Sequence, residues 1–228
     1  MKRLLVAILL LLAAPAAAQI NTGPKVQAQL IAESGEIAPG KSGSVALEEI
    51  IKPGWHTYWS NPGEAGLPSE IKWTLPPGWK AGAIAWPYPK RLPVGPLMNY
   101  GYENKVWLLT TITAPANAKA GDVVTLKAAA GWLVCKDICI PEDTTLTVPL
   151  TVSSLPSAPY TTVKEEFDGW RAKVPVPSPW PVTFSAGDTL DMLVASPSLA
   201  KSQLKDAVFF PLEEGIVAFA NGSAEALL

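Results

Sequence analysis

Apolar and polar residues alternate with a period of two in several short stretches of the chain, and turn-forming residues separate these stretches. Such alternation is typical of β-strands that bury one face, whereas a helix repeats its apolar positions every three or four residues. The apolar positions of the clearest runs are Val26-Ala28-Leu30-Ala32, Val45-Leu47-Ile50-Ile51, Val106-Leu108-Ile112, Val124-Leu126-Ala128 and Leu146-Val148-Leu150-Val152. The pattern predicts an all-β chain built on an antiparallel β-sandwich. Pro149 is expected at an edge or a bulge, because proline donates no ladder hydrogen bond.

The pattern changes after residue 152. Residues 153–162 are predicted to form a linker, because they begin with a stretch rich in serine and proline. A short amphipathic helix is expected at Val163–Trp170, and prolines at alternate positions from 175 to 181 favour extended backbone. Strand-like runs follow at Val182–Phe184, Leu190–Val194, Val208–Phe210 and Ile216–Ala220. These strands are too few for a closed sandwich of about 100 residues. We therefore expect a main domain at residues 19–152 and a partial, truncated second β-rich domain at residues 163–228.

The first 18 residues have the three parts of an export signal. Two basic residues follow the initiator methionine, Leu4–Leu12 is apolar but too short to span a membrane, and Ala16–Ala18 offers small residues for cleavage. We therefore expect residues 1–18 to be a signal peptide and the mature chain to begin near Gln19 in a bacterial periplasm. If the chain is a fragment of a longer protein, a membrane tether is the alternative.

Charge and histidine content argue against two classes of site. The chain carries 18 basic and 20 acidic residues without a basic stripe, which argues against nucleic acid as a partner. His56 is the single histidine, so a histidine-rich metal site cannot form, and no metal site is predicted. Its neighbours Trp55 and Tyr58 favour a packed imidazole over a catalytic one.

The two cysteines of the chain are Cys135 and Cys139, with three residues between them. Residues 123–134 and 144–152 are predicted to be the two strands of a hairpin, with the cysteines near its end. Facing residues near a hairpin loop lie roughly 4.5–5.5 Å apart at Cα, a separation that a disulfide spans. In an oxidising compartment this pair can therefore form a disulfide.

The role of this disulfide is open between a structural staple and a redox switch. A disulfide that closes a loop of only five residues constrains the unfolded chain weakly, by about 2 kcal/mol. The pair is therefore badly placed to act as a structural staple. It is well placed as a switch, because a partner thiol can reach a loop near the surface. Lys136 would favour a thiolate at Cys135, and Asp137 would oppose it. Metal binding by two thiolates alone is a weaker third alternative.

Nine tryptophans are present, and seven of them fall between Trp55 and Trp132. One interpretation is a tryptophan-rich binding module for a carbohydrate or protein ligand, with a purely structural disulfide. The favoured interpretation is packing in the core and under loops. Trp132, three residues before the first cysteine, is expected to lie closest to the redox loop.

Several blocks of the sequence together resemble one known family. They are Gly54-Trp55-His56-Thr57-Tyr58-Trp59, Asn61-Pro62-Gly63, Gly66-Leu67-Pro68, Trp86-Pro87-Tyr88-Pro89, Tyr100-Gly101-Tyr102 and the cysteine block with its trailing Ile140-Pro141. In combination, these blocks between Ile51 and Leu150 resemble the N-terminal periplasmic domain of the DsbD/ScsB thiol:disulfide interchange proteins. The details are closer to the ScsB branch.

The resemblance implies an immunoglobulin-like sandwich with the cysteine pair on a hairpin. It implies a thiol–disulfide exchange component of a protein-disulfide reductase system. Such a domain takes electrons from a membrane electron-transfer domain of the same or a partner protein and reduces thioredoxin-like periplasmic proteins. The redox-active disulfide Cys135–Cys139 then works without any further cofactor, with Cys139 attacking partners and Cys135 as the resolving thiol.

The sequence departs from the family pattern in two places. DsbD separates its cysteines by five residues, and here three lie between them. The family's cap loop has an acidic pair and a phenylalanine before Tyr-Gly, and here Asn99 stands in place of the aromatic residue. We still expect the stretch Leu97–Tyr102 to gate the pair through Met98, Asn99, Tyr100 and Tyr102. The alternative is a plain hairpin whose tyrosines pack on the end of the sandwich.

Overall fold

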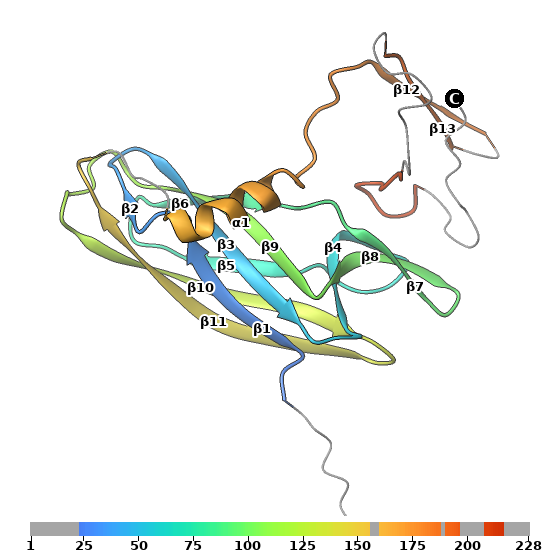
Figure 1. Ribbon diagram of the computed structural model, residues 1–228, viewed down its shortest axis with the longest axis horizontal. Helices are drawn as coiled ribbons and strands as arrows, with labels where there is room; N and C mark the ends of the chain where they lie inside the picture. The colour runs from blue at the N-terminus through green and yellow to red at the C-terminus, as the bar shows by residue number, and fades with distance from the viewer. Residues whose placement is uncertain (1–22, 156–159, 188–189, 197–207, 217–228) are drawn as a thin grey trace, which may run out of the picture.

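The computed structural model of the chain describes residues 23–155, 160–187, 190–196 and 208–216. Within these residues it forms two large β-sheets, one helix and a separate pair of strands (Figure 1). The strands of the two large sheets are β1 (Val26–Ala32), β2 (Glu36–Ile37), β3 (Ser42–Ile51), β4 (His56–Gly63), β5 (Glu70–Thr74), β6 (Lys80–Ala85), β7 (Lys90–Val94), β8 (Leu97–Glu103), β9 (Lys105–Thr113), β10 (Val123–Cys135) and β11 (Cys139–Val152). The predicted signal peptide, residues 1–18, lies outside the described residues.

The two large sheets are almost entirely antiparallel. The first has the strand order β1-β3-β9-β6, and the second has the order β2-β11-β10-β4-β8-β7, with β5 also paired to β10. The short β2 runs parallel to β11, whereas the other neighbours in both sheets are antiparallel. This arrangement is an immunoglobulin-like β-sandwich, which confirms the predicted fold class.

The core is built from the alternating apolar positions of the sequence. On β10, Leu126 and Ala128 are fully buried, while Thr125 and Lys127 beside them are exposed. Burying an aliphatic side chain stabilises the fold by about 1.5–3 kcal/mol, so the alternation decides which face of each strand turns inward. Pro149 lies on β11 opposite Thr125, outside the two positions where β11 pairs with β2, which confirms its edge placement.

Two adjacent glutamates of β3 are buried in different environments. Glu48 accepts a hydrogen bond from the indole N–H of Trp107 at 2.9 Å. Glu49 is 0% exposed, and neither of its carboxyl oxygens has a hydrogen-bond partner within the described part of the chain. Burial raises the pKa of Glu49 to about 7, and the nearby hydroxyls of Thr57 and Ser69 offset only part of this effect.

The helix α1 (Thr161–Arg171) packs on the first sheet (Figure 1). Phe167 is fully buried, and its ring meets that of Trp107 edge-on at a centroid distance of 5.1 Å. Lys105 of β9 forms an ion pair with Glu166 at 3.0 Å. The amphipathic helix predicted at residues 163–170 is therefore confirmed, and its apolar face covers the sandwich.

Beyond α1 the chain forms the strands β12 (Val182–Ala186) and β13 (Leu190–Val194), which pair antiparallel with each other (Figure 1). We call these two strands the second module. Both were predicted, but the strand predicted at Val208–Phe210 is wrong, because this segment joins no ladder and lies against the sandwich through side-chain contacts. Residues 217–220 of the last predicted strand lie outside the described residues. The division into domains stays a prediction.

Candidate redox site

Cys135 and Cys139 face each other at the closed end of the β10–β11 hairpin. They are a direct pair in the ladder, their Cα atoms are 4.1 Å apart, and they form a disulfide. Cys135 also pairs with His56 of β4 on its other side. The predicted hairpin is therefore confirmed, and Cys135 is held between two neighbouring strands.

The two cysteines differ in their exposure. Cys135 is only 2% exposed, whereas Cys139 is exposed to solvent. The loop residues Lys136, Asp137 and Ile138 are also exposed, and the apolar Ile138 beside the pair is 64% exposed. A partner that approaches from solution therefore meets Cys139 first.

Two side chains of β4 line the disulfide. The hydroxyl of Tyr58 lies 3.8 Å from Sγ of Cys139, and Nε2 of His56 lies 3.2 Å from the same hydroxyl. Because side chains alternate along a strand, His56 and Tyr58 share one face of β4, while Thr57 faces the core. In the tautomer with its proton on Nε2, His56 donates to Tyr58, and the Tyr58 hydroxyl is then free to donate to the sulfur.

Burial holds both of these side chains in their neutral forms at pH 7. It lowers the pKa of His56 below 6.5, although the carboxylate of Glu103 on β8 partly opposes this. It also raises the pKa of Tyr58 above 10, so the hydroxyl keeps its proton. A thiolate formed at Cys139 would therefore have a hydroxyl donor in place, and hydrogen bonds to charged acceptors are the strong ones.

The segment after β4 folds back over Tyr58. Gly66 lies so close to the ring that an added Cβ would come within 2.2 Å of it, and its φ of +110° is a conformation that side chains rarely adopt. Asn99 of β8 holds this segment, because its Oδ1 accepts the backbone N–H of Ala65 at 3.2 Å. The cover over Tyr58 therefore comes from the residues 63–66, which we call the 63–66 cover.

The residues predicted to gate the pair lie on the strand β8, beside β4. Tyr100 and Tyr102 are 2% and 5% exposed and belong to the core, and Met98 is half-buried against it. The hydroxyl of Tyr102 donates to a backbone carbonyl of the chain at 2.6 Å. Asn99 is the member of the set that holds the 63–66 cover. Gating by this stretch stays a prediction, and the structure gives its tyrosines a packing role.

Trp132 lies on the core side of β10. It is 6% exposed, and its indole N–H donates to Glu142 at 3.3 Å. Cys135 is three positions further along the strand and so faces the opposite side of the sheet. All seven tryptophans between positions 55 and 132 are buried in the core or half-buried against it, which confirms the packing interpretation.

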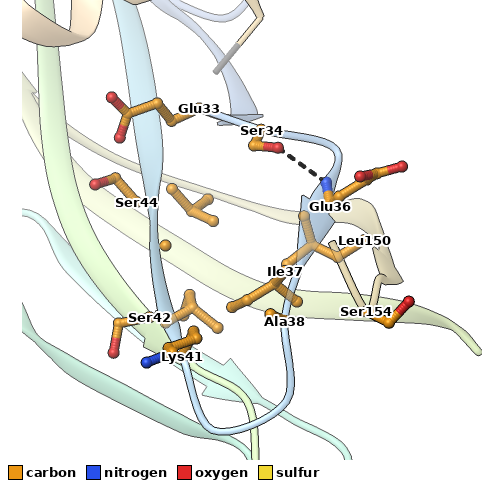
Figure 2. A pocket seen from close by; sticks show the side chains of 13 residues that line it. Glu33, Ser34, Glu36, Ile37, Ala38, Lys41, Ser42, Ser44, Leu150 and Ser154 are labelled. Atoms are coloured by element: carbon orange, nitrogen blue, oxygen red, sulfur yellow. Dashed lines mark hydrogen bonds between the residues drawn. The ribbon is translucent and has the colours of Figure 1, made fainter. Parts of the chain in front are cut away.

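A cavity of about 550 Å³ lies at a different part of the sandwich (Figure 2). Leu150, one of its lining residues, pairs with Val124, eleven residues before Cys135 on the same strand. At about 3.3 Å per residue, the cavity is roughly 35 Å from the disulfide along the ladder. Figure 2 shows Glu33, Glu36 and Lys41 around apolar side chains, without either cysteine.

Among the described residues, no group of three or more histidine, cysteine, aspartate and glutamate side chains is placed to hold a metal ion. No helix in this part of the chain is long and apolar enough to cross a membrane.

Sequence reasoning missed Tyr58 as a residue of the site. It treated His56 as a packed side chain, and His56 is indeed 7% exposed, but it did not connect either residue to the cysteines. The available signal was their spacing of two, which places both rings on one face of a strand, but no strand was predicted at these positions. The sequence could not show that this face meets Cys139, because β4 and β11 are about eighty residues apart.

Comparisons with known proteins bear on the family and the fold of the chain. The family model for the N-terminal part of the thiol:disulfide interchange protein DsbD matches residues 27–151. The crystal structure of the N-terminal periplasmic domain of ScsB from Proteus mirabilis is similar over 76% of this chain, with a TM-score of 0.56 and 22% identity. This chain spans 65% of the length of that domain. Among curated proteins, none matches the chain.

Two further solved structures have TM-scores below 0.5, which is too low to indicate a shared fold. One is AvmM, which catalyses macrocyclization in alchivemycin A biosynthesis (TM-score 0.26, 10% identity, 60% of this chain and 93% of that one). The other is the periplasmic chaperone SfaE (TM-score 0.22, 11% identity, 74% and 87%). The DsbD family model, by contrast, matches more than half of the 228 residues, including both cysteines. The chain therefore belongs to the family of the DsbD N-terminal thiol:disulfide interchange domain.

Proposed function

We propose that this protein is a periplasmic thiol–disulfide exchange domain whose working group is the Cys135–Cys139 pair. The observation that carries the proposal is the asymmetry of the pair: Cys139 is exposed beside the Tyr58 hydroxyl, and Cys135 is buried behind it. Thiol exchange between dithiols needs one accessible sulfur that attacks a partner and a second, neighbouring sulfur that resolves the mixed disulfide. The family membership supports the same chemistry.

The proposed cycle transfers two electrons. In the reduced form, the thiolate of Cys139 attacks one sulfur of a partner disulfide, forms a mixed disulfide and releases the other partner sulfur as a thiolate. The thiolate of Cys135 then attacks Sγ of Cys139, closes the intramolecular disulfide and releases the second partner thiolate. The partner disulfide is reduced to a dithiol, which takes up two protons, and the Cys135–Cys139 dithiol is oxidised.

In this cycle Tyr58 stabilises the charge at Cys139. Its hydroxyl lies 3.8 Å from Sγ in the disulfide form and is protonated at neutral pH. Donation to the thiolate would lower the pKa of Cys139 and raise the fraction that can attack a partner. His56 orients the hydroxyl through its own contact at 3.2 Å. Lys136 and Asp137 are exposed in the loop and present opposite charges to a docking partner.

The proposed partners follow from the same chemistry. Electrons would come from a membrane electron-transfer domain of the same or a partner protein, and they would leave to thioredoxin-like periplasmic proteins. The redox domain would comprise residues 19–152, followed by a linker at residues 153–162 and the partial second domain at residues 163–228. The proposed location is the periplasm, reached through the signal peptide at residues 1–18.

The test is capture of the partner as a mixed disulfide. In a Cys135→Ser variant the resolving thiol is gone, so Cys139 should hold a thioredoxin-like partner covalently, and mass spectrometry of periplasmic extract would identify it. The matched Cys139→Ser variant leaves the buried Cys135 and should capture little or nothing. Equal capture by both variants would contradict the assigned order of the thiols.

A redox titration of the wild-type protein separates exchange from a structural disulfide. A working pair should titrate within the range of exchange proteins, above about −300 mV, where cellular thiol systems can reduce it. A midpoint below that value would make the disulfide inert and would exclude the proposed function. The tryptophans give no support to a carbohydrate-binding module, since those between positions 55 and 132 pack on the core.

A further inference from the structure

An aromatic side chain from the C-terminal part of the chain packs against side chains of the neighbouring strands β4 and β8. The ring of Phe210 meets Trp59 of β4 edge-on at a centroid distance of 6.1 Å and Tyr100 of β8 at 5.1 Å. Trp59 and Tyr100 are themselves 6.3 Å apart in a similar edge-on arrangement. Edge-to-face contacts at these distances are the favoured geometry of aromatic pairs, so the three rings form one cluster across about 150 residues of sequence.

Next to this cluster, one side chain of β4 binds the backbone of the same segment. The amide nitrogen of Asn61 donates to the carbonyl oxygen of Pro211 at 2.9 Å and to that of Glu213 at 3.1 Å. Asn61 is 1% exposed, and Pro211 is buried against the sandwich. A buried amide needs partners for its donors, and these two carbonyls supply them.

The neighbouring Phe209 contacts a different part of the molecule. Its ring lies 6.2 Å from Phe184 on β12, in the second module. Phe209 and Phe210 are adjacent in sequence but contact the second module and the sandwich respectively. This dipeptide therefore joins the two parts of the chain directly.

The second module also has a covalent path to the sandwich. The chain leaves α1 and is held at Lys173, whose carbonyl accepts the backbone N–H of Tyr88 at 2.8 Å. Prolines at alternate positions from 175 to 181 then make a semi-rigid extended spacer. A spacer attached at one end alone would let the second module move relative to the sandwich. The contacts of Phe209 and Phe210 are a second attachment, which restricts that motion.

We propose that Trp59, Asn61 and Tyr100 form a docking surface for an extended peptide with one aromatic side chain and free backbone carbonyls beyond it. Its occupant is the segment Phe210–Glu213 of this chain, which acts as a strap. The strap fixes the second module beside the β4–β8 strands, so a partner of the redox hairpin meets both parts in one fixed arrangement. The proposal rests on contacts that do not involve the cysteines and stands independently of thiol exchange.

The experiment is limited proteolysis of the full chain with a glutamate-specific protease, with cleavage after Glu213 followed by mass spectrometry. Phe210→Ala and Asn61→Ala each remove one half of the docking contacts, and each should speed this cleavage about tenfold or more, since cleavage follows local opening. The matched control is Phe209→Ala, which removes an equal ring from the adjacent position but leaves the docking contacts. Its cleavage rate after Glu213 should stay within about twofold of wild type.

Two results would overturn the strap. One is an unchanged rate in Phe210→Ala, and the other is an equal acceleration in Phe209→Ala, which would indicate general loosening. Cleavage after Glu142 on β11, followed in the same digest, reports opening of the sandwich itself. If cleavage at Glu142 rises in parallel with that at Glu213 in both docking variants, the acceleration comes from unfolding, and the proposal fails.

Discussion

Replacement of the buried Glu49 by glutamine should change the free energy of unfolding, relative to wild type, more favourably at high pH than at low pH. Glu49 is 0% exposed on β3, and no described group forms a hydrogen bond with its carboxyl oxygens. The groups that face it are neutral: the hydroxyls of Thr57 and Ser69 partly stabilise its charge, and the pKa of the Tyr102 phenol is raised by burial and, to a smaller extent, by the same carboxylate. Ionisation of Glu49 therefore occurs without a countercharge from these neighbours.

The size of the effect follows from the two pKa values of this carboxyl. It is 4.5 in the unfolded chain and about 7 in the folded protein, so between these values the folded state holds a proton that the unfolded state has released. The free energy of unfolding therefore falls as pH rises from 4.5 to about 7 and stays lowered above that. At about 1.36 kcal/mol per pKa unit, the loss is roughly 3 kcal/mol. Glutamine cannot ionise and avoids it.

The assay is urea unfolding of the oxidised protein at pH 4 and at pH 8, in which the disulfide cysteines do not titrate. The free energy of unfolding of Glu49→Gln minus that of wild type should rise by about 3 kcal/mol between the two pH values. The matched control is Glu48→Gln, which weakens the accepted bond from Trp107 and should lower stability at both. A difference for Glu49→Gln that is the same at pH 4 and pH 8 would refute the reasoning.

Two further predictions concern the surroundings of Cys139. Tyr58→Phe removes the hydroxyl that lies 3.8 Å from the sulfur of Cys139, and it should raise the pH midpoint for alkylation of the reduced thiol by about one unit. The control Tyr88→Phe, at an exposed tyrosine, should leave this midpoint unchanged. Equal midpoints for the two variants would exclude the hydrogen bond. Gly66→Ala forces a Cβ into the Tyr58 ring and should lower the free energy of unfolding by at least about 2 kcal/mol, measured in urea. Gly95→Ala, also at positive φ but with no atom near its Cβ, should cost only about 1 kcal/mol, and equal losses would mean that the 63–66 cover tolerates displacement.

The strands and the hairpin could be predicted because local patterns determine them. Alternating apolar residues decide which face of a strand is buried, and a three-residue gap between cysteines at the end of two such runs places them opposite each other. The helix at residues 163–170 followed from the same kind of local periodicity. The strand order could not be predicted in this way, because it depends on contacts between segments far apart in the chain.

The gating stretch shows where local reasoning reached its limit. Apolar and aromatic residues from Leu97 to Tyr102 suited a mobile cap, but they equally suit an interior strand, and β8 is one. The side chain that holds the 63–66 cover is the polar Asn99, through a bond to the backbone of Ala65. Residue type alone does not predict a hydrogen bond to a backbone thirty-four residues away.

Tyr100→Ala should lower the melting temperature, because the ring of Tyr100 is buried against Trp59.

The short loop between the cysteines links the stability of the fold to the reduction potential of the cysteine pair. A thermodynamic cycle equates the difference in folding free energy between oxidised and reduced protein with a shift of the reduction potential of the pair. Closing a loop of this size constrains the unfolded chain by only about 2 kcal/mol, which for two electrons corresponds to roughly 45 mV. Strongly reducing and strongly oxidising thiol pairs differ by about 150 mV. Most of any tuning must therefore come from the side chains around the sulfurs, and domains with the same hairpin can be set to different potentials by exchanging the residues at positions 56 and 58.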